Sequence, residues 1–94
     1  MSNCILLSSD KIREYADRIL NNRGVEISPD YIYGTVAVLY NRGEIINVND
    51  VDSYVDKVAD FAITNGLTTS DPPQSAIDAI NEAKRILETG ASST

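Results

Sequence analysis

The residues whose types and spacing could do chemistry are three aspartates, Asp52, Asp56 and Asp60, which recur at four-residue intervals. On a helix this spacing places them on one side, with neighbouring side chains about 6 Å apart. Such a row could dock on a basic protein surface, and it could also imitate the phosphates of a nucleic acid. The alternative interpretation is an ordinary solvated face, where Lys57 is the only nearby base to offset repulsion between like charges.

The side chains that most enzymes and metal sites require are scarce. The chain has no histidine and one cysteine, Cys4, so it can form neither a Ser-His-Asp arrangement nor a zinc site of several cysteines. The aspartates do not follow EF-hand spacing, and no glycine-rich phosphate loop is present. We therefore expect no catalysis, no metal and no cofactor. The alternative, a small carboxylate-dependent enzyme, would need two acids in one concave pocket.

A second candidate surface lies in the uncharged stretch 31–41, YIYGTVAVLYN. If this stretch is helical, Tyr33 and Tyr40 share one side, while its aliphatic residues share another. A helix that is apolar all round is either central in its domain or covered by another subunit. Because tyrosine is enriched at interfaces, we expect a homodimer contact or a partner groove across Tyr33, Ala37 and Tyr40.

Start and stop signals divide the chain into helices that would position these residues. Each segment begins near a capping serine, asparagine or aspartate, with an acid or proline in its first turn, and ends at a glycine. In the first segment one apolar face carries Ile12, Tyr15, Ala16, Ile19 and Leu20. The predicted fold is all-α, a compact bundle of four short helices near residues 9–23, 29–42, 48–65 and 72–89.

The second helix has a competitor. Its tyrosine, valine and threonine content also suits a small β-hairpin at about 35–48, which would make the fold α+β. The Ser28-Pro29-Asp30 start signal favours a helix, and so does the Asn-Arg-Gly ending that also closes the first helix. Gly34 weakens a helix interior, so it marks either a close helix crossing or the strand alternative.

Composition limits the class of partner. The chain has 94 residues and a net charge of −6, with the whole excess of acids lying from Glu44 onward. This balance argues against direct binding to nucleic acid or to an anionic membrane, and no apolar run is long enough for a membrane helix. We expect one cytoplasmic helical domain at 1–90 with a frayed tail at 91–94.

The predicted function is a non-catalytic, small acidic module that binds another protein, as an inhibitor, an antitoxin-like protein or an adaptor. Its partner would carry a basic surface, and a homodimer is the self-association version. The alternative is a nucleic-acid mimic that blocks a basic site on a DNA- or RNA-handling protein. The predicted partner-binding residues are Tyr33, Tyr40, Asp52, Asp56 and Asp60.

Overall fold

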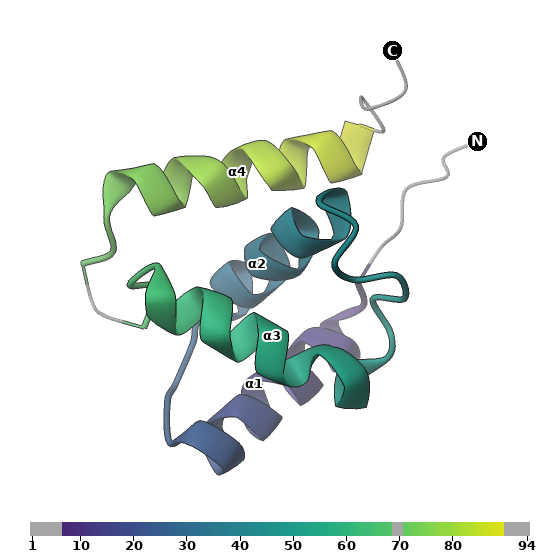
Figure 1. Cartoon of the computed structure of the whole chain (residues 1–94), viewed down its shortest axis with the longest axis vertical. Coiled ribbons are helices and arrows are strands. Elements are labelled where there is room, and N and C mark those ends of the chain that lie inside the picture. Colours follow the sequence, from purple (N-terminus) through teal and green to yellow (C-terminus); the bar gives the residue numbers. More distant parts are fainter. Residues whose placement is uncertain (1–6, 69–70, 90–94) are drawn as a thin grey trace.

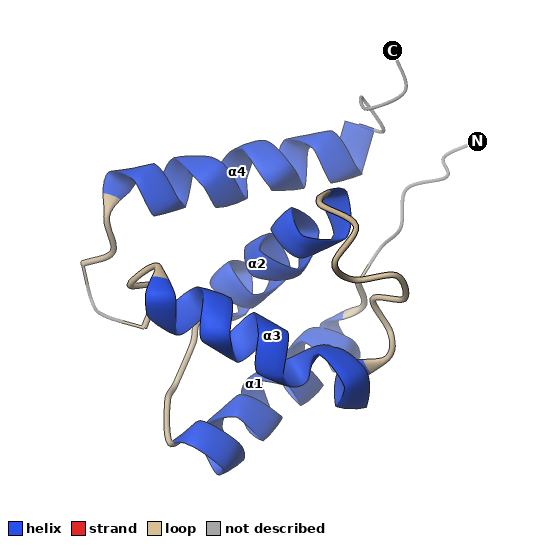
Figure 2. Cartoon of the chain, in the orientation of Figure 1, coloured by secondary structure: helices blue, strands red, loops and turns tan. Residues whose placement is uncertain are grey.

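The computed structural model describes residues 7–68 and 71–89. These ranges form four α-helices: α1 (Ser9–Arg23), α2 (Pro29–Asn41), α3 (Val51–Thr64) and α4 (Gln74–Thr89) (Figure 1). They contain no strand, so the predicted all-α bundle is confirmed (Figure 2). The alternative hairpin at about 35–48 is wrong, because residues 35–41 continue α2 and residues 42–50 form the loop to α3. Cys4 and the predicted tail at 91–94 lie outside the described residues.

The two ends of α1 follow the local signals in the sequence. The Ser8 hydroxyl accepts a hydrogen bond from the backbone N–H of Lys11 at 3.2 Å, which caps α1. Gly24 ends α1 with a φ of +66°, a left-handed conformation that only glycine adopts without strain. Helix α3 begins three residues later than predicted, because the Asp50 carboxylate caps it by accepting from the N–H of Ser53 at 3.4 Å. The residues just before it instead form a turn closed by the hydrogen bond from Asp50 N–H to the Asn47 carbonyl, at 3.0 Å.

Helix α2 is the centre of the structure. It packs against α1, α3 and α4, and Figure 1 shows α4 on one side of it with α1 and α3 on the other. Its residues from Gly34 to Leu39 are all buried, as the uncharged composition of this stretch requires. Within the described ranges α4 packs against no helix but α2. The first three helices therefore form one unit, and α4 is added to it through α2.

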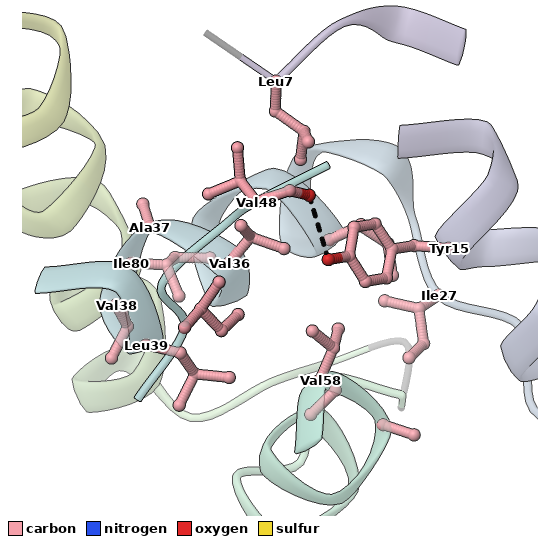
Figure 3. Close-up of a cluster of buried hydrophobic side chains, with 14 of the residues drawn as sticks. Leu7, Tyr15, Ile27, Val36, Ala37, Val38, Leu39, Val48, Val58 and Ile80 are labelled. Carbon is pink, nitrogen blue, oxygen red and sulfur yellow. Dashed lines mark hydrogen bonds between the residues drawn. The ribbon is translucent and has the colours of Figure 1, made fainter. Parts of the chain in front are cut away.

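The contact between α2 and α4 is close because one partner is glycine. A Cβ atom placed on Gly34 would lie 2.6 Å from the Cβ of Ile80, which is shorter than normal contacts between non-bonded carbon atoms. Ile80 is buried between the two helices, near Val36 and Ala37 in Figure 3. Gly34 thus marks a close helix crossing, the first of its two predicted roles.

One buried polar side chain joins α1 to the loop before α3. Tyr15 is completely buried, and its hydroxyl donates a hydrogen bond to the backbone carbonyl of Val48 at 3.1 Å (Figure 3). Burial, helped by the negative charge of Asp50, raises the pKa of Tyr15 to about 12. The neutral hydroxyl is therefore part of the core at physiological pH.

The lengths of the helices and their polar faces also bear on a membrane location. In the part of the chain that the structure describes, no helix is both long enough and apolar enough to cross a bilayer.

Candidate functional site

The aspartate row lies on the solvent side of α3, beside α1. The side chains of Asp52 and Asp56 are each 74% exposed, and that of Asp60 is 67% exposed. Two arginines of α1 reach them: Arg18 pairs with Asp52, while Arg23 lies 2.9 Å from Asp60 and 3.5 Å from Asp56. The three carboxylates therefore share one side of α3, as the spacing predicted, but each has a base from another helix beside it.

The arginines are the residues that sequence reasoning missed. Lys57 was expected to offset the repulsion within the row, but its amine lies 3.9 Å from Glu44 instead. The hydrogen bond and charge of Asp60 raise the pKa of the Arg23 guanidinium further above its ordinary value. No local spacing could have shown these pairs, because more than thirty residues separate their members. The outer edge of the α1–α3 contact thus presents alternating charges rather than a row of free carboxylates.

The two predicted tyrosines have different neighbours in the structure. Tyr33 is half-buried, and its hydroxyl donates to the Glu88 carboxylate of α4 at 3.4 Å. Ala37, which was expected to line a groove between Tyr33 and Tyr40, is completely buried. The middle of that predicted groove is therefore part of the core.

Tyr40 borders a hollow of about 520 Å³ between the end of α2, the α2–α3 loop and α4. Its apolar lining comes from Tyr40, Ile45, Ile46 and Ile86, and we call the three accessible residues Tyr40, Ile46 and Ile86 the Ile46 surface. Ile46 is 73% exposed, the largest exposure among the big aliphatic side chains that the structure describes. Sequence reasoning placed Tyr40 on a binding surface but did not single out Ile46.

The loop holds Ile46 outward by fixing the residues around it. The N–H of Glu44 donates to the Leu39 carbonyl at 2.9 Å, which turns the chain directly after α2. Ile45 and Val48 are both buried, so the loop is anchored before and after Ile46. The N–H of Ile46 itself donates to the hydroxyl of Tyr54 on α3, at 3.3 Å. Ile46 is thus an apolar side chain presented to solvent by an ordered backbone.

A second hollow lies along α1. It has a volume of about 430 Å³, and its apolar floor consists of Ile12, Ala16 and Leu20, with Ile27 and Pro29 opposite. We call this hollow the α1 groove. Leu20 belongs to the predicted apolar face of the first helix, but its side chain is 46% exposed, because α2 and α3 cover the side of α1 that carries Tyr15 and Ile19.

The ionisable groups of the α1 groove lie at its rim. Asp17, Glu26 and Arg13 line it, and all three are exposed. None of them forms an ion pair with another described residue, in contrast to the aspartates of α3. Across the described ranges, no group of three or more histidine, cysteine, aspartate or glutamate residues is placed to hold a metal ion.

No model of a known protein family, no curated protein and no solved structure matches this chain. The candidate function therefore rests on the chemistry of its surfaces, which include two hollows with apolar linings, the one at the Ile46 surface and the α1 groove.

Proposed function

We propose that this chain is a non-catalytic acidic module that binds another protein through the Ile46 surface. The observation that supports this proposal most is the exposure of Ile46, at 73%, within a loop whose neighbouring residues are anchored in the core. The hydrogen bond from the Ile46 N–H to Tyr54 and the burial of Ile45 keep the Ile46 side chain outside the core.

The energetics of such a surface favour association. Covering an exposed isoleucine contributes about 1.5–3 kcal/mol from apolar burial alone. An ordered loop also loses little conformational freedom when a partner docks, so more of this free energy appears as affinity. Tyr40 adds a half-buried aromatic ring beside Ile46, and tyrosine is among the residues that contribute most to protein interfaces.

Charge supports the same class of function. The net charge of −6 creates a field that attracts a partner with a basic surface and speeds the encounter. The aspartate row gives weaker support to the nucleic-acid mimic, because Arg18 and Arg23 already neutralise part of its field. The apolar Ile46 surface would then provide the contact that lasts after the encounter.

Affinity capture from native cells, read by mass spectrometry, tests the proposal. Wild-type protein should capture a partner, and Ile46→Asp should capture at least about tenfold less of it. The reason is that a buried charge replaces the apolar contact. Ile63→Asp is the matched control, since Ile63 is also exposed but lies on α3 outside this surface. Equal capture by all three proteins would show that the Ile46 surface does not bind the partner.

Light scattering distinguishes a second copy of the chain from another protein. If the molar mass of wild type rises to that of a dimer as the protein concentration increases, and that of Ile46→Asp does not, the partner is a second copy of the chain. A constant monomer mass leaves a different protein as the partner.

A further inference from the structure

The α1 groove has an apolar floor that the described residues of the bundle leave uncovered. Ile12, Ala16 and Leu20 recur every four residues, so they form one strip along the length of α1. Ile27 and Pro29 form the opposite wall, and the volume of about 430 Å³ falls within the range of pockets that hold ligands. Leu20 is exposed and Ile12 and Ala16 are half-buried, so solvent reaches an apolar strip with a polar rim, an arrangement typical of an interaction site.

The charges of α1 are sorted between its two sides. Arg18 and Arg23 point to α3 and pair with its aspartates, so these bases are not available to the groove. At the groove, Asp17 and Glu26 form no ion pair with a described residue, and Arg13 is the one base among the lining residues. The rim is therefore acidic in balance, on a chain that is itself strongly acidic.

We propose that the α1 groove binds a short segment of another protein that carries bulky apolar side chains next to lysine or arginine. The apolar side chains fill the space above Ile12, Ala16 and Leu20, and the basic residues lie beside Asp17 and Glu26. Apolar contact supplies most of the affinity, while the charges select basic segments over acidic ones. This site shares no lining residue with the Ile46 surface, so it is a second docking site, independent of the first.

Titration with designed peptides tests this assignment on the full chain. The probes are two short peptides that share the same leucines and differ only in carrying lysines or glutamates. Isotope-labelled protein reports the location of binding through amide chemical shifts, and the shift changes give the affinity. The lysine peptide should bind about tenfold more tightly than the glutamate peptide, with changes confined to residues 9–20 and 26–29.

Two results of this titration would overturn the proposal. One is no binding of the lysine peptide at about 1 mM, the weak end of the affinity scale. The other is shift changes that map to a different surface, including the Ile46 surface.

Charge reversal at the rim separates specific docking from general attraction to an acidic protein. In Asp17→Lys with Glu26→Lys the preference should invert, so that the glutamate peptide binds more tightly. The control, Asp78→Lys with Glu82→Lys, makes the same change in net charge on exposed positions of α4 and should keep the preference for lysine. If the control lowers affinity for the lysine peptide as much as the rim variant does, attraction is general and the proposal fails.

Replacement of Leu20 tests the floor without disturbing the core. Because Leu20 is 46% exposed, Leu20→Ser should keep the helical circular dichroism of wild type and weaken both peptides about tenfold. Unchanged affinity in a folded Leu20→Ser protein would show that the apolar strip is not the binding surface.

Discussion

Helices α1 and α3 meet along a line whose outer edge carries exposed ion pairs, whereas α2 and α4 meet where a glycine faces an isoleucine. The ion pairs lie in solvent, so each is expected to contribute less than about 1 kcal/mol to the free energy of unfolding. The α2–α4 contact instead depends on the absence of one carbon atom. We therefore expect substitutions at the exposed ion pairs to change the free energy of unfolding little, and substitutions at the buried α2–α4 contact to change it strongly.

The largest expected effect comes from filling the glycine crossing. Gly34→Leu should lower the free energy of unfolding by about 3 kcal/mol or more, because even its Cβ would lie 2.6 Å from the Cβ of Ile80. Urea denaturation followed by circular dichroism measures the change. Ala79→Leu on the exposed side of α4 is the control and should change stability little. A Gly34→Leu protein as stable as wild type would remove the contrast between the two contacts.

The next effect concerns Tyr15 of α1, which is completely buried and bonded to the loop before α3. The tyrosine ionises near its ordinary pKa of 10.0 when unfolded and near 12 when folded, because burial disfavours the charged form. Its contribution to stability is therefore complete below pH 10 and lost as the pH rises toward 12, by roughly 2–3 kcal/mol.

Denaturation at a series of alkaline pH values measures this loss. Tyr15→Phe is the control: it should be less stable at neutral pH by about 1–3 kcal/mol, because the Val48 carbonyl loses its donor. The variant should also lack the part of the alkaline decline that Tyr15 causes. Parallel declines in the two proteins would assign the pH dependence to other groups.

A smaller effect is expected at the ion pairs themselves. Arg23→Met removes the partner of Asp56 and Asp60 and should destabilise the chain by less than about 1 kcal/mol at low salt. Added salt should shrink the difference from wild type, because it screens exposed charges. If Arg23→Met lowered the free energy of unfolding as much as Gly34→Leu does, the ion pairs would be as important to stability as the α2–α4 contact.

The smallest effect is expected on partner capture. Asp52→Asn with Asp56→Asn keeps the size of both side chains and removes two charges. The amount of partner captured through the Ile46 surface should change less than about threefold, because an exposed ion pair contributes little free energy. The same capture experiment measures it, with Ile46→Asp as the reference for full loss. Loss of capture by the asparagine variant would identify the aspartate row as the docking surface.

The helices could be predicted from the sequence because their signals are local. Ser8, Pro29 and Gly24 act on backbone atoms within a few residues of themselves, and Gly34 lies in the uncharged stretch 31–41 at the point where a neighbouring helix comes close. The start of α3 was misplaced because Val48 continues the apolar pattern of the helix while lying buried in the preceding turn.

The candidate sites depend on how distant helices are placed. Arg23 meets Asp60 only after α1 and α3 pack side by side, and spacing along one helix cannot show such a pair. Leu20 has the periodicity of a core residue, yet its position relative to α2 leaves it exposed. Ile46 is exposed because a loop holds it outward, which no helical or strand period describes.

The single neighbour of α4 gives this chain two levels of protection against hydrogen exchange. Among the helices of the described ranges, α4 contacts α2 alone. Detachment of α4 therefore exposes one side of α2 and leaves α1, α2 and α3 packed together. Amide protons of α4 can then exchange with solvent through this partial opening, at a lower free energy than complete unfolding. Amides of α2, enclosed by three helices, exchange only when the whole chain unfolds, so the slowest protons should mark the centre of the fold.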